Sequence, residues 1–401
     1  MLNRQYWRLW FASTISNLGD GVTLAAMPLL AATLTRSPSK VALVTLFITL
    51  PWLLFALLGG ALADRYDRRV LMGTADLFRM VAIGGVGVAV LADAESLVLL
   101  CAISFLLGSA ECVFDNASQS ILPMVVERDG LEKANGRLYS AEIVTNQFAG
   151  PPLGAALFAT AAATPFLFDA TSFGIAAVLV LTLRGVFRPQ RTVTTTIRTD
   201  IAEGVRWLRD HTLLRTLALA LGVMNLFGTA MFSILVLYAL EVLKLSETGY
   251  GLLLTAGAVG GLIGSFLGSW LSARLGAGST LLIAAAVFGL AALVPALWAN
   301  TIAVGISFAV SAAFGTIWNI ITVSMRQTIV PEELLGRVNS AYRLLGWGTM
   351  PIGAAVGGVL ADGFGLRAPF LVTGILSTAL VLAMAPTVNN RTVASARAAA
   401  G

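Results

Sequence analysis

The sequence predicts an all-α integral membrane protein with twelve transmembrane helices, arranged as two pseudo-symmetric bundles of six. Hydrophobic residues make up 57% of the 401 residues and charged residues only 12%, with a mean hydropathy of +0.85. Soluble domains are about 45–50% apolar and about 25% charged. The chain also divides into about twelve apolar runs of roughly the 20 residues that cross a bilayer. Finally, the second half repeats short motifs of the first half.

Each apolar run accounts for one expected helix. The first six are expected near residues 7–32, 41–63, 70–92, 97–121, 138–161 and 165–184, and the second six near 213–240, 249–272, 279–299, 301–325, 338–361 and 368–386. The predicted domains are an N-terminal bundle (1–187), a cytoplasmic linker (188–212), a C-terminal bundle (213–386) and a disordered tail (387–401). In the linker, Ile201, Val205 and Leu208 lie at helical intervals, which predicts an amphipathic helix at the membrane surface.

The distribution of basic residues predicts the topology. Lys and Arg concentrate in loops that stay in the cytoplasm. Of the 26 Lys and Arg residues, only four fall on the outer side in this layout: Arg36, Lys40, Lys244 and Arg367. Both termini are therefore expected in the cytoplasm, and no removable signal peptide is expected after Met1. The net charge of +5 fits these loops better than it fits nucleic-acid binding.

Several kinds of chemistry have no matching residues. His211 is the only histidine, and Cys101 and Cys112 share one apolar run, so the sequence predicts no metal site and no cofactor. No Gly-Lys-Ser/Thr sequence is present to cradle a nucleotide phosphate. The motifs of serine hydrolases and zinc proteases are also missing, so an enzyme is not expected. Transport driven by an ion gradient is the expectation that remains, and protons are the simplest ion.

The two halves of the chain are related by an internal repeat. Four short motifs recur in order, at offsets of 208, 209, 208 and 199 residues, starting at Asn17, Leu62, Gln119 and Pro152. In this alignment Asp20 corresponds to Gly228 and Glu111 to Asn319. The first half therefore carries acids inside its membrane spans that the second half lacks. Two parallel repeats predict a substrate path near the bilayer midplane, between the halves.

Five charges in six residues separate the second and third apolar runs. The segment reads Gly60-Ala61-Leu62-Ala63-Asp64-Arg65-Tyr66-Asp67-Arg68-Arg69. It resembles the signature loop of the major facilitator superfamily, although that loop usually has glycine where this chain has Asp67. The resemblance implies gating roles for Gly60, Asp64, Arg65, Arg68 and Arg69, with Asp64 against the start of span 11 when the cytoplasmic side is closed. It also implies that Asp115 pairs with Arg68 or Arg69.

Two further resemblances concern the type of transporter. Gly150-Pro151-Pro152-Leu153-Gly154 resembles the span 5 element of drug/proton antiporters, in which glycines permit close helix packing and proline bends the helix. Ordinary membrane packing is the alternative, and the arginine that many antiporters carry in span 4 is absent. The segments Asn17–Gly21 and Ala75–Arg79 resemble a bacterial branch that includes macrolide efflux proteins and the enterobactin exporter. The resemblance implies a multi-pass protein of the bacterial inner (plasma) membrane.

Ionisable residues inside the spans are the candidate exchange groups. A charge at the bilayer centre costs about 2.5–3.5 kcal/mol or more, so such a residue usually faces a cavity or a partner. Asp20 and Glu111 are predicted to bind a proton or substrate, supported by Asn17, Glu142 and Asn146. Asp20 could instead be a structural, hydrogen-bonded residue. Asp76 and Arg79, three residues apart, are predicted to be a structural pair. Polar and aromatic residues of the second half are candidates to line a cavity: Asn225, Trp318, Asn319 and Trp347.

These features predict a proton-coupled secondary transporter that exports amphipathic drugs or secondary metabolites by alternating access. Its expected partners are a small amphipathic substrate, protons and the lipid bilayer, with no nucleic acid, and the chain is expected to be a monomer. Three alternatives remain. A dedicated siderophore exporter would share the fold, although basic cavity residues would suit its anionic cargo better. A nutrient importer also shares the fold, and a membrane enzyme lacks catalytic residues.

Overall fold

The computed structural model describes residues 3–63, 65–127, 130–185, 187–188, 197–331 and 334–398. Within these ranges the first half of the chain forms α1 (Arg4–Leu34), α2 (Pro38–Ala63), α3 (Arg68–Leu91), α4 (Leu97–Val125), α5 (Leu131–Glu142), the π-helical stretch η2 (Ile143–Ala149), α6 (Gly150–Thr160) and α7 (Thr164–Leu181). The second half begins with α8 (Ile197–Asp210), which occupies the segment where a linker helix is expected, and α9 (Thr212–Phe232).

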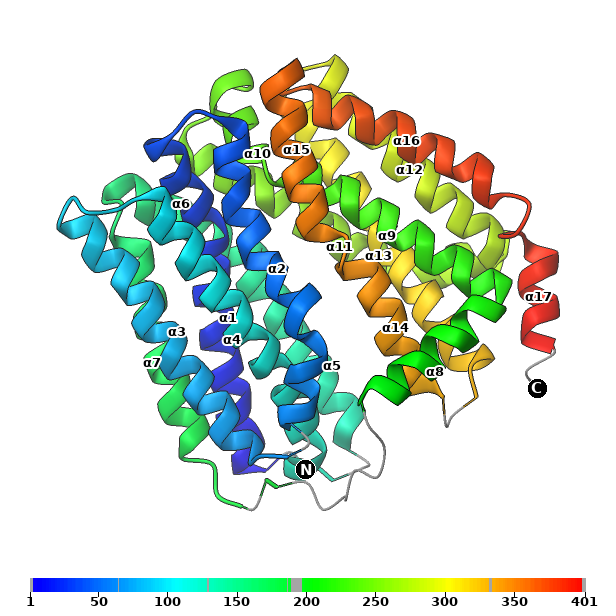
Figure 1. Ribbon diagram of the computed structural model, residues 1–401, viewed down its shortest axis with the longest axis horizontal. Coiled ribbons are helices and arrows are strands. Elements are labelled where there is room, and N and C mark those ends of the chain that lie inside the picture. The colour runs from blue at the N-terminus through cyan, green and yellow to red at the C-terminus, as the bar shows by residue number, and fades with distance from the viewer. Residues whose placement is uncertain are drawn as a thin grey trace. The chain divides into compact units, whose positions relative to one another are not determined.

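The rest of the second half completes the fold in the same way. It forms α10 (Leu235–Leu237), η3 (Tyr238–Val242), α11 (Glu247–Leu275), α12 (Ala277–Leu297), α13 (Thr301–Ile329), α14 (Leu335–Trp347), α15 (Met350–Phe364), α16 (Ala368–Met384) and α17 (Asn390–Ala398). The course of the chain through these helices can be followed in Figure 1.

Within the described residues, twelve helical segments correspond to the twelve predicted membrane spans. Ten segments of the described chain are long and apolar enough to cross a membrane by themselves, α14 and α15 together forming one of them. The apolar helix α16 has 17 residues and forms another. The last runs from Leu131 to Thr160 through α5, η2 and α6, where a π-helical stretch interrupts the α-helix. The predicted all-α transmembrane fold is therefore confirmed.

The chain separates into two compact units. One contains Met1–Arg36, Leu43–Thr194 and Leu245–Thr255, and the other contains Ser37–Ala42, Thr195–Lys244 and Ala256–Gly401. Their internal packing repeats. In the first unit α1 packs on α6 and α7, and α3 packs on α4 and α7; in the second, α9 packs on α15 and α16, and α12 packs on α13 and α16. This equivalence of helix neighbours agrees with the internal repeat.

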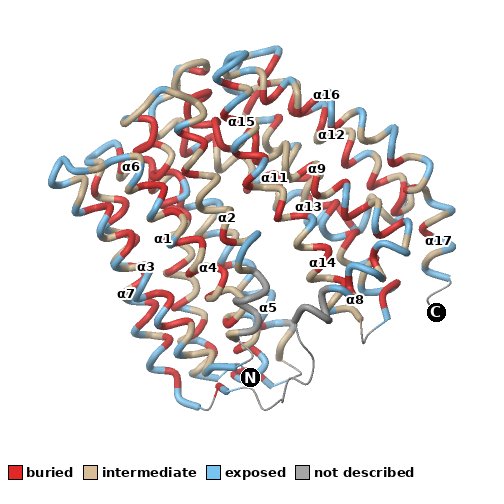
Figure 2. The backbone as a smooth tube through the Cα atoms, in the orientation of Figure 1, coloured by how far each residue is buried: buried red, intermediate tan, exposed pale blue. Residues whose placement is uncertain are grey.

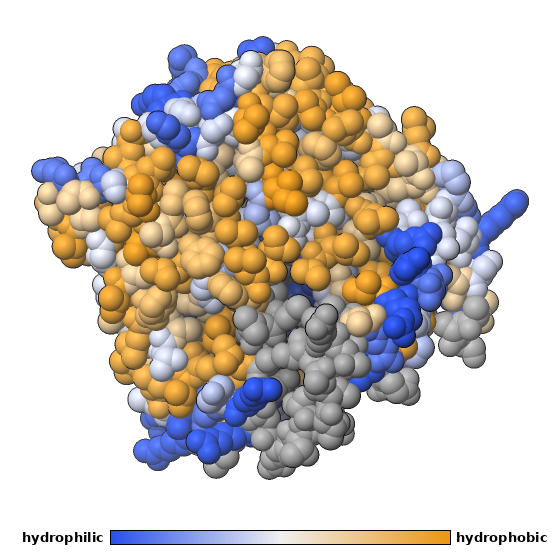
Figure 3. Space-filling view, in the orientation of Figure 1, coloured by the Kyte–Doolittle hydropathy of each residue, from blue (hydrophilic) through white to orange (hydrophobic). Residues whose placement is uncertain are grey.

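Each unit has its own apolar core, and its outer surface is also apolar. In the first unit Tyr6, Met72 and Ile121 are buried in one cluster, and in the second Leu217, Leu281 and Met325 are buried in another. Buried positions alternate with exposed ones along the helices (Figure 2). Apolar side chains cover most of the visible face (Figure 3). Hydrophilic side chains gather at the ends of the helices. Large exposed residues such as Val81 and Phe266 are expected where lipid replaces water.

The C-terminal tail differs from its prediction. The sequence predicts disorder for 387–401, but Asn390–Ala398 forms α17. Val393 is buried in the core of the second unit, and Ala396 packs against it. The Asn390 side chain binds the α11–α12 connection, donating to the Leu275 carbonyl at 2.8 Å and accepting from the Ser279 amide at 3.0 Å. These contacts are tertiary, so the polar, Ala-rich composition of the tail does not reveal them.

Candidate functional site

Asp20, near the middle of α1, lies beside a buried arginine of α3. An Asp20 Oδ1 lies 3.6 Å from an Arg79 guanidinium nitrogen. The same guanidinium bonds Asp76 at 2.5 Å, one turn earlier on α3. The Asp20 side chain is 29% exposed, whereas that of Arg79 is 3% exposed and that of Asp76 fully buried. Asp76 and Arg79 are therefore paired as predicted, but the pair also includes Asp20.

Aromatic rings hold Arg79 in place from two further helices. Its guanidinium carbon lies 4.5 Å from the centre of the Phe114 ring on α4 and 4.3 Å from that of Phe173 on α7. A cation on an aromatic face gains about 0.5–2 kcal/mol, the larger value applying where water is excluded. Two polar atoms of the group, Nε of Arg79 and Oδ2 of Asp76, have no hydrogen-bond partner among the described residues. The ion pair therefore has unused hydrogen-bonding capacity.

A second buried acid, Asp169 on α7, lies against α1. Thr23 donates a hydrogen bond to one carboxylate oxygen of Asp169 at 2.5 Å, and Ser172 donates to the other at 3.1 Å. This approach requires Gly19, because a Cβ there would lie 2.0 Å from the Ser172 hydroxyl and 2.1 Å from the carboxylate. Asp169 lies within electrostatic range of Asp20 and Arg79. It belongs to the same charged region, and it is not among the predicted site residues.

The span that contains Gly150, Pro151 and Gly154 packs closely on α1. A Cβ on Gly150 would lie 2.6 Å from the Gly21 Cα, and one on Gly154 would lie 2.2 Å from the Val22 carbonyl oxygen. The prolines remove two backbone donors, and the preceding residues adopt the π-helical stretch η2. Such stretches within α-helices are frequent at functional sites. The glycine–proline element therefore lets a distorted helix lie directly beside the segment that carries Asp20.

The other predicted exchange residues differ in their burial and in their contacts. Glu111 on α4 is half-buried and within electrostatic range of Asp20, Arg79 and Glu142. Glu142, the last residue of α5, is exposed. Asn17 donates to the carbonyl of Ser13 in its own helix. Asn146 meets α1 through its backbone, since a Cβ on Gly21 would lie 2.3 Å from its carbonyl oxygen. Asn17 is therefore bonded within its own helix, and Asp20 meets a neighbouring span through Arg79.

The loop between α2 and α3 explains why this chain has Asp67. The Asp67 carboxylate accepts hydrogen bonds from the backbone amides of Arg69 at 3.0 Å and Val70 at 3.4 Å, so it caps the N-terminus of α3. Arg68 donates to the Ser120 carbonyl on α4, the helix that carries Asp115. Arg69 donates to the Leu183 carbonyl after α7.

The positions of the other predicted gating residues can be stated only briefly. Arg65 is exposed, Gly60 lies in the helical backbone near the end of α2, and Asp64 lies outside the described residues.

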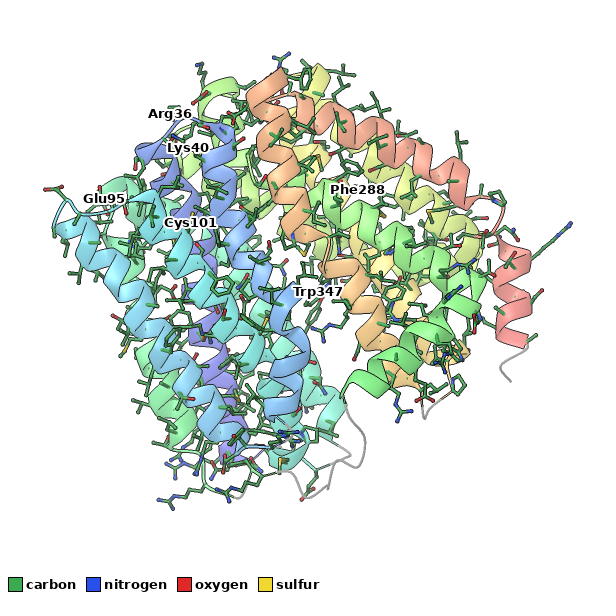
Figure 4. All side chains as sticks on the ribbon, in the orientation of Figure 1. Arg36, Lys40, Glu95, Cys101, Phe288 and Trp347 are labelled. Carbon is green, nitrogen blue, oxygen red and sulfur yellow. The ribbon has the colours of Figure 1, made fainter. Side chains whose placement is uncertain are left out.

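The candidate cavity residues of the second unit have separate environments. Trp318 is 2% exposed within the apolar core, so in this structure it is a core residue and not a cavity wall. Asn225 on α9 donates to the Gly346 carbonyl on α14 at 2.9 Å. Asn319 is exposed. Trp347, at the end of α14 (Figure 4), has the Arg343 guanidinium carbon 4.5 Å from its ring centre.

Comparison with known proteins decides the family. A family model described as transmembrane secretion effector matches residues 1–399. The chain belongs to this family of the major facilitator superfamily. Members of the superfamily are transporters and not enzymes. Apolar helices and efflux-pump relatives together indicate a multi-pass bacterial membrane protein.

Named relatives cover nearly the whole chain. The multidrug efflux pump Tap of Mycobacterium tuberculosis is 29% identical over 393 residues, which cover 94% of this chain and 92% of Tap. Tap of Mycolicibacterium fortuitum is 28% identical, with 91% of each chain covered. An uncharacterised transporter of the superfamily from Bacillus subtilis, YfiS, is also 28% identical and covers 91% of this chain and 88% of its own.

Solved structures confirm the fold. A bacterial homologue of the iron transporter ferroportin, in an inward-facing state, has a TM-score of 0.76 at 19% identity, covering 96% of this chain and 99% of its own. The nucleoside transporter NupG has a TM-score of 0.78 at 10% identity, covering 95% and 98%. Both are transporters of the major facilitator type. At such identities the likeness concerns the fold alone.

Asp20 and Glu111 can be predicted from the sequence, but the group of charged residues around Asp20 cannot. The structure brings Asp20, Arg79, Asp76 and Asp169 together from α1, α3 and α7. A signal for Arg79 and Asp169 was present, because each is an ionisable residue within an apolar span. The sequence could not show which residue of the neighbouring helices would be the partner of Asp20.

Proposed function

We propose that this protein is a proton-coupled exporter of amphipathic drugs, which it moves across the bacterial inner membrane by alternating access. The observation that carries the proposal is the environment of Asp20. Its carboxylate is partly exposed within a membrane span, yet it lies 3.6 Å from a buried arginine. A carboxylate in this position can exchange a proton or a cationic substrate while its charge is balanced. The naming of two relatives as multidrug efflux pumps supports the export of drugs.

Cationic amphipathic molecules are the substrate class that suits this unit. Glu111 and Glu142 place two further acidic side chains within electrostatic range of Asp20. A cation would be favoured by this excess of acid, and an anion would be repelled. Proton and drug would then be alternative ligands, because either one neutralises the same carboxylate. A proton bound from one side and released on the other would thereby drive the drug in the opposite direction.

The loop between α2 and α3 is proposed to gate the cytoplasmic side. Arg68 and Arg69 anchor its end through backbone carbonyls near α4 and α7. Gly60, Asp64, Arg65 and Asp115 are proposed to act with them, as the superfamily resemblance implies. We also propose that the protein works as a monomer with both termini in the cytoplasm. The N-terminal bundle is proposed to end at residue 187, and the linker is proposed to end at residue 212, where the C-terminal bundle follows.

The decisive experiment measures export in proteoliposomes. Purified protein would be reconstituted, a pH gradient imposed, and movement of the cationic dye ethidium followed by fluorescence. We expect gradient-dependent movement by the native protein and at least a tenfold loss in Asp20→Asn. Asp93→Asn is the matched control, since Asp93 is exposed at the end of α3 with φ of 50°, a conformation that asparagine tolerates well. Equal transport by native protein and Asp20→Asn would show that Asp20 is structural.

A further inference from the structure

The arrangement around Arg79 contains one more carboxylate than a structural ion pair needs. A buried guanidinium keeps its charge, and one buried carboxylate is enough to neutralise it. Asp76 does this at 2.5 Å from within the same helix. Asp20 is an additional partner at 3.6 Å, on another helix. The arginine is therefore shared between two acids.

The two acids differ in their access to solvent. Asp76 is fully buried, so it can exchange a proton with water only after a rearrangement. The Asp20 side chain is 29% exposed, so it is the more accessible of the two acids. Asp76 is thus the permanent partner of Arg79, and Asp20 is the variable one. The same conclusion follows from the distances, because the shorter bond is made to the inaccessible acid.

Unused hydrogen-bonding atoms indicate where the arginine can move. Oδ2 of Asp76 and Nε of Arg79 have no hydrogen-bond partner among the described residues. A carboxylate and a guanidinium form two parallel bonds when their geometry permits. If Asp20 were neutralised, a small shift of Arg79 could complete such a pair with Asp76. The flanking rings of Phe114 and Phe173 would keep the guanidinium in its plane during this shift.

We propose that Arg79 is a positioning residue for Asp20, shared between Asp20 and Asp76, and that it moves toward Asp76 when a proton or a cationic substrate neutralises Asp20. The inference rests on the exchange role proposed above for Asp20. Other charged groups face this region: Glu111 and Asp115 on α4, Glu142 on α5 and Asp169 on α7. All four are acids, so Arg79 is the cation that opposes them within this set.

Two substitutions separate this role from simple structural support, because they act in opposite directions. In Asp76→Asn the arginine loses its permanent partner and pairs fully with Asp20, so Asp20 stays charged to lower pH. In Arg79→Gln the opposing cation is removed, so Asp20 takes up its proton at higher pH. Each midpoint is expected to shift by about one pH unit or more, the usual effect of a nearby charge. Arg79→Lys keeps the charge and should stay near the native midpoint.

The test is an infrared titration of the whole purified protein in detergent. The carbonyl band of the protonated acid is assigned to Asp20 by its absence in Asp20→Asn. Opposite shifts in Asp76→Asn and Arg79→Gln support the proposal. Shifts in the same direction, or no shift in variants that unfold at the native temperature, overturn it. If Arg79→Gln does not fold, Asp76→Asn alone decides, since it leaves one acid for the arginine.

Ethidium transport by the same variants distinguishes this inference from the proposed function. If the native protein shows no movement driven by a pH gradient but the titration shifts as expected, the proposed function fails and the shared arginine stands. If transport depends on the gradient and on Asp20 but neither variant shifts the titration, the proposed function stands and the inference about Arg79 fails. A role in folding alone, without electrostatic coupling to Asp20, would lower the rate without moving the pH midpoint.

Discussion

The Thr255 hydroxyl on α11 lies within hydrogen-bond distance of two backbone carbonyls, that of Phe148 at 3.3 Å and that of Gly251 in its own helix at 3.2 Å. In a regular α-helix the donor to the Phe148 carbonyl would be residue 152, which here is a proline without an N–H group. Pro151 and Pro152 also contact α11 nearby, since a Cβ on Gly251 would lie 2.7 Å from the Pro151 carbonyl oxygen. A side chain of a different helix thus supports the distorted segment that packs beside Asp20.

Removing this hydroxyl should destabilise the first unit. Thr255→Val keeps the shape of the side chain but leaves the Phe148 carbonyl without that donor, which costs about 1 kcal/mol. Thr255→Ser keeps the donor and is the matched control. Thermal unfolding of the purified protein in detergent would compare them. A valine variant as stable as the serine variant would mean that the bond contributes nothing.

Adding a methyl group to Gly154 should disturb the packing of α6 on α1. Its Cβ would lie 2.2 Å from the Val22 carbonyl oxygen, so Gly154→Ala must move backbone and should cost about 1–3 kcal/mol. Gly85→Ala on α3 is the matched control, because nothing lies within 4 Å of its added Cβ. Alanine there should leave stability unchanged or raise it by up to about 1 kcal/mol. The prediction is contradicted if both variants unfold at the same temperature.

Asp67 should stabilise α3 as its N-terminal cap. Asp67→Ala removes the acceptor for two backbone amides and should cost about 1 kcal/mol. Asp67→Asn retains an acceptor oxygen and should unfold close to the native temperature. A comparison of thermal midpoints in detergent checks this directly. Equal losses in both variants would show that the negative charge, and not the cap, is what matters.

Stability should fall in mild acid because of His211, which lies between α8 and α9. Its Nδ1 accepts a hydrogen bond from the Leu214 amide at 3.3 Å, and its ring stacks on Trp207. Burial lowers the pKa of His211 below its usual value of about 6.5. Protonation would remove the acceptor and place a positive charge at the N-terminus of α9, where the helix dipole opposes it.

The folded state favours the neutral form of His211, so protonation of His211 lowers the stability of the protein. The stabilisation is complete above the unfolded pKa of about 6.5 and is lost as pH falls through the lowered pKa of the folded protein. Neighbouring charges come from Arg209, Asp210 and Arg215, and Arg215 bonds the Arg209 carbonyl. His211→Asn keeps a capping oxygen and does not titrate. Between pH 7 and pH 5 the native protein should therefore lose more thermal stability than this variant.

The sequence by itself determined the transmembrane architecture. Apolar runs such as 41–63 and 279–299 can be stable only where lipid or other helices replace water, so length and composition predict their number and order. The internal repeat and the placement of the basic loops can also be identified from the amino-acid sequence. Asp20 could be selected in the same way, because a charged residue inside such a run is costly wherever the helix lies.

Tertiary structure alone decided the partners. Asp20 meets Arg79 and Asp169 meets Thr23 because α1, α3 and α7 pack at one register, and nothing local to any of these residues specifies that register. The burial of Trp318 and the helix at Asn390–Ala398 likewise depend on contacts with distant segments. The amino-acid composition of a span determines how favourable its transfer into lipid is. The pairing of charges depends instead on distances of a few ångströms, which are set only when the helices pack.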